Sequence, residues 1–160
     1  MKIAAILMDV DGVLTDGSVL IDGLQHEAKR ISFADVMGIT IGRRAGLLFG
    51  LVSGEDGPVL TAIAAKLGVA DVYGGCKDKA AAVRDFAAKH DLPLGHVCFI
   101  GDDANDVAAF ACSGLSAAPS SAHSSALTAA DVTLQHSGGA GAVRELVDKL
   151  LSCQADCESQ

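Results

Sequence analysis

Two aspartates placed two residues apart carry the strongest chemical signal in this sequence. Asp9 and Asp11 follow the apolar run of residues 3–8, and Gly12 comes next. Residues two apart on a strand project to the same face, and glycine permits a sharp turn after them. Two carboxylates about 4 Å apart repel by roughly 4 kcal/mol at an effective dielectric of about 20, a cost that a hard divalent cation reverses. The pair predicts a Mg²⁺ site; the alternative is a simple turn with Asp9 as a cap.

A hydroxyl, a glycine and an acid follow the apolar run of residues 48–52. They are Ser53, Gly54 and Glu55. The Ser53 side chain can donate to a phosphate oxygen, and the backbone near Gly54 offers N–H groups. This turn therefore indicates an oxyanion site, unless Ser53 only caps a helix that starts near residue 57.

Lys79 stands near the start of a predicted helix over residues 78–89, where the helix dipole disfavours a cation. A cation in that place suggests a use, because it could neutralise Asp9 and a bound phosphate together. The alternative is a solvated surface lysine, as Lys77 could be.

Three more carboxylates come directly after the apolar run of residues 97–100. They are Asp102, Asp103 and Asp106. Such a density of acids at the end of a buried strand is costly without a metal ion. A cap on the helix that begins near Asn105 would explain one of them and leave the others unassigned.

The elements that position these motifs alternate between apolar runs and helical patterns, which is typical of a parallel sheet covered on both faces. We therefore predict an α/β fold with a Rossmann-like parallel sheet, whose chemistry lies at the carboxyl ends of the strands. The expected strands are residues 3–8, 48–52, 71–73, 97–100, 115–117 and 132–134. The expected helices are residues 35–46, with Asp35 as a possible cap, 57–67, 78–89, 105–112, 121–129 and 142–152.

Residues 18–31 interrupt this alternation. They have the pattern of a β-hairpin, with Asp22 and Gly23 suited to its turn. The apolar residues 19–21 would be exposed on a protruding hairpin, so the hairpin either covers its own sheet or packs on another subunit. We expect assembly through this hairpin.

Length and composition predict one compact domain. The chain has 160 residues and 50% hydrophobic content, which supplies an ample core and leaves no room for a large second module. We place the domain at residues 1–153 and a loose tail at residues 154–160. With 20 acidic against 12 basic residues and a net charge of -8, the chain lacks the basic face of a nucleic-acid binder.

The sequence predicts a cytoplasmic location. The apolar residues 3–8 are too few for a secretory signal, and the longest uncharged stretch, residues 107–130, is too polar to span a membrane. The odd number of cysteines, at positions 76, 98, 112, 153 and 157, favours reduced thiols.

Together and in this order, the four motifs resemble those of the haloacid dehalogenase-like phosphatase superfamily, and the resemblance runs through nearly the whole chain. It implies that Asp9 is a nucleophile that forms an aspartyl-phosphate and that Asp11 is a general acid and then a base. It implies Mg²⁺ held by Asp9, the Asp11 carbonyl and Asp102. The phosphate-binding residues that it implies are Ser53, Gly54 and Lys79.

The chain resembles cap-less 3-deoxy-D-manno-octulosonate 8-phosphate phosphatases in four segments. They are residues 9–17, the hairpin, residues 101–103 and residues 138–145. Those enzymes are homotetramers whose hairpins pack at the centre, and a neighbouring subunit helps close each site in place of a cap domain. The resemblance implies the same assembly here, with lipopolysaccharide biosynthesis as the pathway.

Four positions bear on the substrate. Ala34 and Ala140 stand where the octulosonate enzymes usually carry arginines. Glu55 and Lys66 are similar to substrate-binding residues of nonulosonate 9-phosphate phosphatases, which act on sialic acid phosphates; a surface salt bridge is the alternative. The arginine run usual in those enzymes is absent at residues 61–63. The resemblance thus implies a 2-keto-3-deoxy sugar acid phosphate as the substrate, with the nonulosonate slightly favoured over the octulosonate.

Two other functions fit parts of the pattern. A phosphorelay receiver also combines acids, a hydroxyl and a lysine, but its phosphorylated aspartate ends a mid-chain strand, where this chain has Ser53. A catalytically silent scaffold that partners a cytidylyltransferase is the other alternative, and the complete set of motif residues argues against it.

Overall fold

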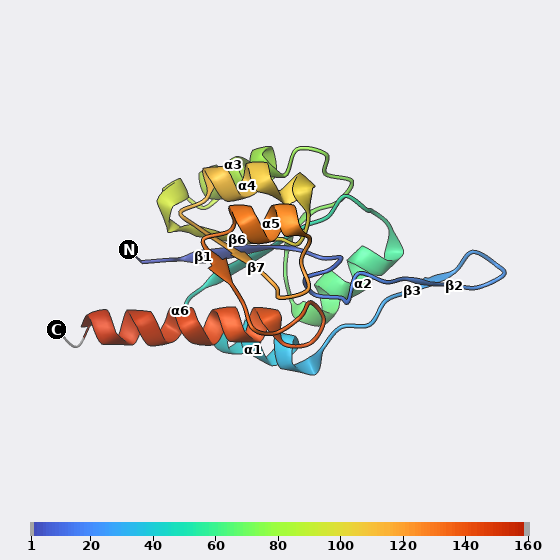
Figure 1. Ribbon diagram of the computed structural model, residues 1–160, viewed down its shortest axis with the longest axis horizontal. Helices are drawn as coiled ribbons and strands as arrows, with labels where there is room; N and C mark the ends of the chain where they lie inside the picture. The colour runs from blue at the N-terminus through green and yellow to red at the C-terminus, as the bar shows by residue number, and fades with distance from the viewer. Residues whose placement is uncertain (1, 159–160) are drawn as a thin grey trace.

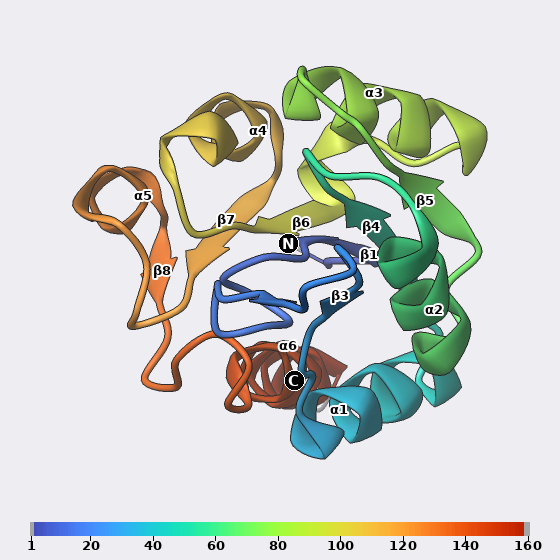
Figure 2. The same ribbon diagram turned by 90° about the vertical axis from the view of Figure 1, so that its right-hand side faces the viewer.

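A six-stranded parallel sheet forms the centre of the computed structural model, which describes the backbone of residues 2–158 and the side chains of residues 2–155. The strand order is β5-β4-β1-β6-β7-β8 (Figure 2). The strands are β1 (Ala5–Asp9), β4 (Leu48–Val52), β5 (Asp71–Tyr73), β6 (Val97–Ile100), β7 (Leu115–Ala118) and β8 (Val132–Thr133). The α/β fold predicted from the sequence is confirmed.

Helices cover both faces of the sheet (Figure 2). One layer contains α3 (Lys79–Lys89), α4 (Val107–Cys112) and α5 (Ser124–Ala129). The other contains α1 (Phe33–Arg44), α2 (Pro58–Leu67) and α6 (Ala142–Glu158). Two short 3-10 helices, η1 (Leu94–His96) and η2 (Ala104–Asp106), precede β6 and α4. Within residues 2–158, no helix combines the length and the apolar character needed to cross a membrane.

The central strand β1 contributes to two apolar layers. Ile6 and Met8 pack on the side of α1, α2 and α6, whereas Ala5 and Leu7 pack on the side of α3, α4 and α5. Every residue of β1 is buried, as expected for a central parallel strand with both faces covered. This packing fixes the point at which Asp9 leaves the sheet.

Between β1 and α1 the chain forms a hairpin that projects away from the body (Figure 1). Its strands are β2 (Leu20–Ile21) and β3 (Glu27–Ala28). The turn is wider than the one predicted at Asp22 and Gly23, because the Asp22 amide donates to the His26 carbonyl and Gln25 takes the positive φ of 64°. The Leu20 and Leu24 side chains are 76% and 77% exposed. The predicted hairpin is confirmed.

Asp35 does not cap α1 as predicted. The Ser32 side chain caps α1 by accepting from the Ala34 amide at 3.1 Å. Asp35 is fully buried instead, and its carboxylate accepts from the backbone amides of Gly141 (3.2 Å) and Arg144 (2.9 Å). Burial raises the pKa of Asp35, against the effect of these amides. Asp35 thus ties α1 to the beginning of α6.

The loop before α6 packs on the turn that follows β1. The Gly139 amide donates to the Val13 carbonyl at 2.9 Å. A Cβ atom on Gly138 would collide with the Gly12 carbonyl, so only glycine permits this approach. Residues near the two ends of the chain therefore meet beside Asp11.

The last helix is longer than predicted. α6 continues to Glu158 instead of ending near residue 152, so it enters the segment that we expected to be a loose tail. The Gln154 side chain donates to the Ile3 carbonyl at 2.7 Å. The division into a domain of residues 1–153 and a tail stays a prediction. Residues 159–160 and the Cys157 side chain lie outside the described part of the chain.

Candidate active site

The carboxyl ends of β1, β4 and β6 surround a polar cavity of about 290 Å³. Its lining residues are Asp9, Asp11, Gly17, Gly54, Glu55, Lys79, Asp102, Asp103 and Asn105. The structure therefore brings members of all four sequence motifs to one edge of the sheet.

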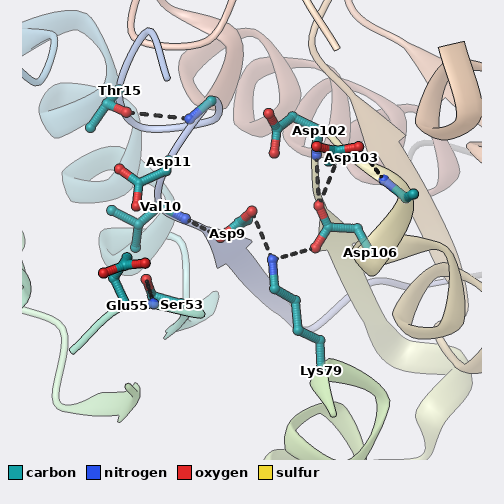
Figure 3. A network of polar contacts seen from close by, with 12 residues as sticks. Asp9, Val10, Asp11, Thr15, Ser53, Glu55, Lys79, Asp102, Asp103 and Asp106 are labelled. Carbon is teal, nitrogen blue, oxygen red and sulfur yellow. Dashed lines mark hydrogen bonds and ion pairs between the residues drawn. The ribbon is translucent and has the colours of Figure 1, made fainter. Parts of the chain in front are cut away.

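Lys79 is buried between two carboxylates (Figure 3). Its Nζ lies 2.8 Å from Asp9 Oδ2 and 2.7 Å from Asp106 Oδ1. Only 3% of Lys79 is exposed, so it is not a solvated surface lysine. Although burial favours the neutral amine, the two carboxylates raise the pKa of Lys79 above its usual value. The group is a fixed cation at the floor of the acidic cavity.

Burial and a neighbouring carboxylate disfavour the ionised forms of Asp9 and Asp102. Burial and repulsion from Asp106 raise the pKa of Asp9 to about 7, against the lowering effect of Lys79. The same two causes raise the pKa of Asp102 to about 6. A divalent cation between these carboxylates would favour their ionised forms.

The acids that follow β6 have separate structural roles. Asp103 caps η2 by accepting from the next amide at 2.6 Å. Asp106 is fully buried; its Oδ2 accepts from the amides of Asp102 (2.9 Å) and Asp103 (3.1 Å), while its Oδ1 accepts from Lys79. Both oxygens of Asp106 are thus occupied. The sequence contained Asp106 within its acidic motif but gave no sign of this organising role.

The donors at the site fit a hard cation such as Mg²⁺. One oxygen from each of Asp9, Asp102 and Asp106 lies within 4.8 Å of the others. The Asp102 carboxylate also lies against the backbone of Gly12, where a Cβ atom would collide with it. Gly12, with φ 84°, therefore allows Asp102 to reach across to the β1 turn beside Asp11. An all-oxygen set of this kind is what Mg²⁺ and Ca²⁺ prefer.

Lys29 holds Asp11 and was missed by the sequence analysis. Its Nζ lies 2.8 Å from both Oδ1 and Oδ2 of Asp11. Lys29 directly follows β3, so it belongs to the base of the hairpin. Its one signal in the sequence is that it is a cation in the predicted hairpin, the segment that follows the two aspartates.

Thr15 was also missed, and it shapes the turn after β1. It is fully buried, and its Oγ1 accepts from the amides of Gly12 (3.3 Å) and Gly17 (3.1 Å). These bonds satisfy backbone donors in a turn that no helix or strand supports.

Ser53 is buried at the end of β4 and does not cap α2. Its Oγ accepts from the Glu55 amide at 3.1 Å, which leaves the hydroxyl proton to donate. The cap residue of α2 is Gly57, which has no side chain to contribute. Gly54 and Glu55 both line the catalytic cavity.

The structure does not place the predicted substrate-binding pair in one cavity. Glu55 lines the catalytic cavity, whereas Lys66 lines a separate cavity of about 670 Å³ between the hairpin and α2. The Lys66 Nζ lies over the Phe33 ring, 5.2 Å from its centroid. Lys29 lines this larger cavity and Asp11 lines the smaller one. The ion pair between Lys29 and Asp11 therefore lies between the two cavities.

Ala34 and Ala140 share a third cavity, of about 420 Å³. His136, Arg144 and Lys149 are among its other lining residues. The two departures from the octulosonate pattern therefore lie on the walls of one cavity.

The sequence is similar to known hydrolases. Residues 49–146 match the family described as haloacid dehalogenase-like hydrolase. A 3-deoxy-D-manno-octulosonate 8-phosphate phosphatase of Haemophilus influenzae is 34% identical over 153 residues, which cover 96% of this chain and 85% of that protein.

Solved structures of 3-deoxy-D-manno-octulosonate 8-phosphate phosphatases have the same fold as this chain. The cobalt-bound form of the Haemophilus influenzae deoxy-D-mannose-octulosonate 8-phosphate phosphatase has a TM-score of 0.93 and 34% identity, covering 96% of this chain and 90% of that one. The 3-deoxy-D-manno-octulosonate 8-phosphate phosphatase of Moraxella catarrhalis, in complex with a magnesium ion, a phosphate ion and a KDO molecule, has a TM-score of 0.92 and 27% identity. That match covers 98% of this chain and 90% of the other.

Proposed function

This chain belongs to the haloacid dehalogenase-like hydrolase family, and on that premise we propose that it is a Mg²⁺-dependent phosphatase of a 2-keto-3-deoxy sugar acid phosphate. The observation that carries the proposal is the buried Asp9 at the end of the central strand, paired with Lys79 and facing Asp102. The family and the class of enzyme agree with the prediction from the sequence.

Asp9 is the nucleophile of this proposal. One of its carboxylate oxygens attacks the phosphorus, the bond to the sugar oxygen breaks, and an aspartyl-phosphate forms. Asp11, which lines the same cavity, donates a proton to the departing sugar oxygen. It later takes a proton from the water that attacks phosphorus, which breaks the bond to Asp9 and releases phosphate. Splitting the reaction in this way suits phosphate monoesters, whose uncatalysed hydrolysis is slow enough for enzymes to reach about 10²¹-fold acceleration.

Ser53, Gly54 and Lys79 bind the phosphate. The Ser53 hydroxyl retains a proton to donate, and the Lys79 ammonium lies at the floor of the cavity. A cation fixed by Asp9 and Asp106 needs no rearrangement when the substrate arrives, which favours stabilisation of charge that develops on phosphate oxygens.

The Mg²⁺ ligands are Asp9, the Asp11 carbonyl and Asp102. The proximity of the Asp9 and Asp102 oxygens and the raised pKa of both groups support this assignment. When bound, the ion offsets the negative charge that carboxylates and phosphate would otherwise bring together.

The first candidate substrate is 3-deoxy-D-manno-octulosonate 8-phosphate, which supports a place in lipopolysaccharide biosynthesis. The names of the relatives favour it. A nonulosonate 9-phosphate is the second candidate, because Glu55 lines the catalytic cavity and Ala34 and Ala140 replace the arginines usual in octulosonate enzymes. The presence of Lys66 in another cavity weakens the second candidate for a single chain.

The proposal includes a homotetramer formed through the hairpin, with no nucleic acid or membrane as partner. The exposed Leu20, Ile21 and Leu24 supply an apolar surface that a second copy could cover. A cytoplasmic location belongs to the same proposal and is supported by the free thiols of Cys76, Cys98, Cys112 and Cys153.

The test is phosphate release from 3-deoxy-D-manno-octulosonate 8-phosphate and from a nonulosonate 9-phosphate, with and without Mg²⁺. We expect Mg²⁺-dependent turnover of one of them, and loss of turnover in Asp9→Asn while a cooperative urea transition shows that this variant is still folded. Activity on other phosphates alone would keep the chemistry and remove the sugar acid. Absence of activity on every phosphate ester would overturn the enzyme proposal in favour of a silent scaffold.

A further inference from the structure

The hairpin supplies a cation to Asp11. The Lys29 ammonium is equidistant from both Asp11 oxygens, at 2.8 Å, across 18 residues of sequence. In the described part of the chain, Lys29 is the only cation paired with Asp11. Asp11 follows a strand and begins a turn, so its side chain has few other constraints.

The burial of Lys29 argues against an incidental surface ion pair. Its side chain is 9% exposed, whereas that of the next residue, Arg30, is 83% exposed and lies 3.6 Å from Asp16. Lysine is seldom buried to this extent without a specific partner. A partly exposed ion pair adds little to stability, so stability alone does not account for the burial of the Lys29 side chain.

The orientation of Asp11 matters for the reaction. A general acid transfers its proton only when its oxygen lies within hydrogen-bond reach of the leaving atom. Misplacement by about 1 Å can cost about 100-fold in rate. An ammonium that contacts both oxygens restrains rotation of the ionised carboxylate. When Asp11 carries the proton that it donates, Lys29 contacts the other, unprotonated oxygen, and the second contact forms again once the proton has left.

We propose that Lys29 is a positioning residue that holds the Asp11 carboxylate in the orientation needed for proton transfer to the leaving group. The proposal rests on the function assigned above to Asp11. It makes the hairpin part of the catalytic apparatus of its own chain, in addition to any role in assembly.

The test compares leaving groups. A sugar or simple alkyl phosphate needs a proton on its leaving oxygen, whereas p-nitrophenyl phosphate has a leaving group that departs as the anion. The quantity compared is kcat/KM, which reports the steps up to loss of the leaving group. For Lys29→Met with Mg²⁺ present, we expect kcat/KM to fall about 10–100-fold on the alkyl ester and less than about 3-fold on the aryl ester. On the alkyl ester the fall should lie in kcat rather than KM.

Two variants complete the design. Lys29→Arg should recover most of the alkyl-ester activity, because guanidinium can also contact both carboxylate oxygens. Arg30→Met removes a cation from the adjacent position and should behave as wild type. Urea transitions establish that each variant is folded, and Lys29→Gln replaces Lys29→Met if the latter does not fold.

An equal loss on both esters, no loss on either, or a rise confined to KM for the sugar acid would overturn the positioning role. The last result would make Lys29 a substrate contact. Failure of the wild type and of Lys29→Met alike would instead overturn the proposed function. An active wild type with an inactive Asp9→Asn and an unaffected Lys29→Met would leave the function standing and remove this inference.

Discussion

The Lys79 ammonium lies 2.7 Å from Asp106 Oδ1, and both side chains are buried beneath the catalytic cavity. The Asp106 carboxylate also accepts hydrogen bonds from the amides of Asp102 and Asp103. Through Lys79, the first residue of α3, it joins that helix to the turn after β6. The cation that we propose to bind phosphate and the turn that we propose to bind the metal thus share Asp106 as one support.

Replacing Asp106 should therefore destabilise the whole domain. In Asp106→Ala the buried Lys79 loses one of its two carboxylates, and we expect the free energy of unfolding to fall by about 3–5 kcal/mol. Asp103→Ala removes the cap of η2 and an exposed contact with the His123 ring at 3.8 Å, and it should cost about 1 kcal/mol. Urea titration measures both variants. Equal losses would show that Asp106 has no special structural role.

Mg²⁺ should stabilise the folded chain through Asp9 and Asp102. A ligand at 100 times its Kd adds about 2.7 kcal/mol to the free energy of unfolding. We expect Mg²⁺ to raise the Tm of the wild type, chelation to reverse the rise, and Asp102→Asn to abolish most of it. Asp103→Asn serves as the matched control and should keep the response. A rise of the same size in Asp102→Asn would place the ion elsewhere.

Glu145 should make the fold sensitive to acid. Its carboxylate accepts from the amides of Gln135 and His136 and contacts the His136 ring at 2.9 Å. Although burial opposes ionisation, these bonds lower the pKa of Glu145 from 4.5 to about 2. The folded state therefore binds this proton less tightly than the unfolded chain does. The contribution is complete above pH 4.5 and is lost as the pH falls toward 2.

Urea titrations at several pH values between 6 and 3 measure this effect. Glu145→Gln should be less stable than the wild type at pH 6, and the difference should shrink as the pH falls. Glu27→Gln, at an exposed hairpin position, should follow the wild-type profile. A difference between Glu145→Gln and the wild type that stays constant with pH would contradict the assignment.

Charges on the hairpin should disrupt assembly without unfolding the chain. Leu20 and Leu24 are about three-quarters exposed, so Leu20→Asp with Leu24→Asp removes little packing within one chain. We expect light scattering to report a tetramer for the wild type and a smaller species for this variant. Leu94→Asp, at an exposed site on η1 away from the hairpin, should retain the wild-type mass. A monomeric wild type would remove the tetramer from the proposal.

The central strands could be predicted from the sequence because each is a short apolar run bounded by polar or turn residues. β4, β5 and β6 begin and end at the expected residues. α6 was predicted too short, since residues 153–158 contain no large apolar side chain and give no helical apolar face to follow.

The cavity could be predicted because parallel strands bring their carboxyl ends to one edge. Its supports could not, since Lys29 meets Asp11 across 18 residues and Asp35 meets Arg144 across 109. Pairings of that kind depend on how the hairpin and helices pack. Nothing in the local pattern around either residue reveals its partner.

The contact between the loop before α6 and the turn after β1 bears on how the protein is made. Val13 is translated 126 residues before its partner Gly139. Asp35 likewise waits for the amides of Gly141 and Arg144. A nascent chain can form the central strands long before it can complete the turn that carries Asp11. The contacts that hold this turn and Asp35 can therefore form only after Arg144 has been translated.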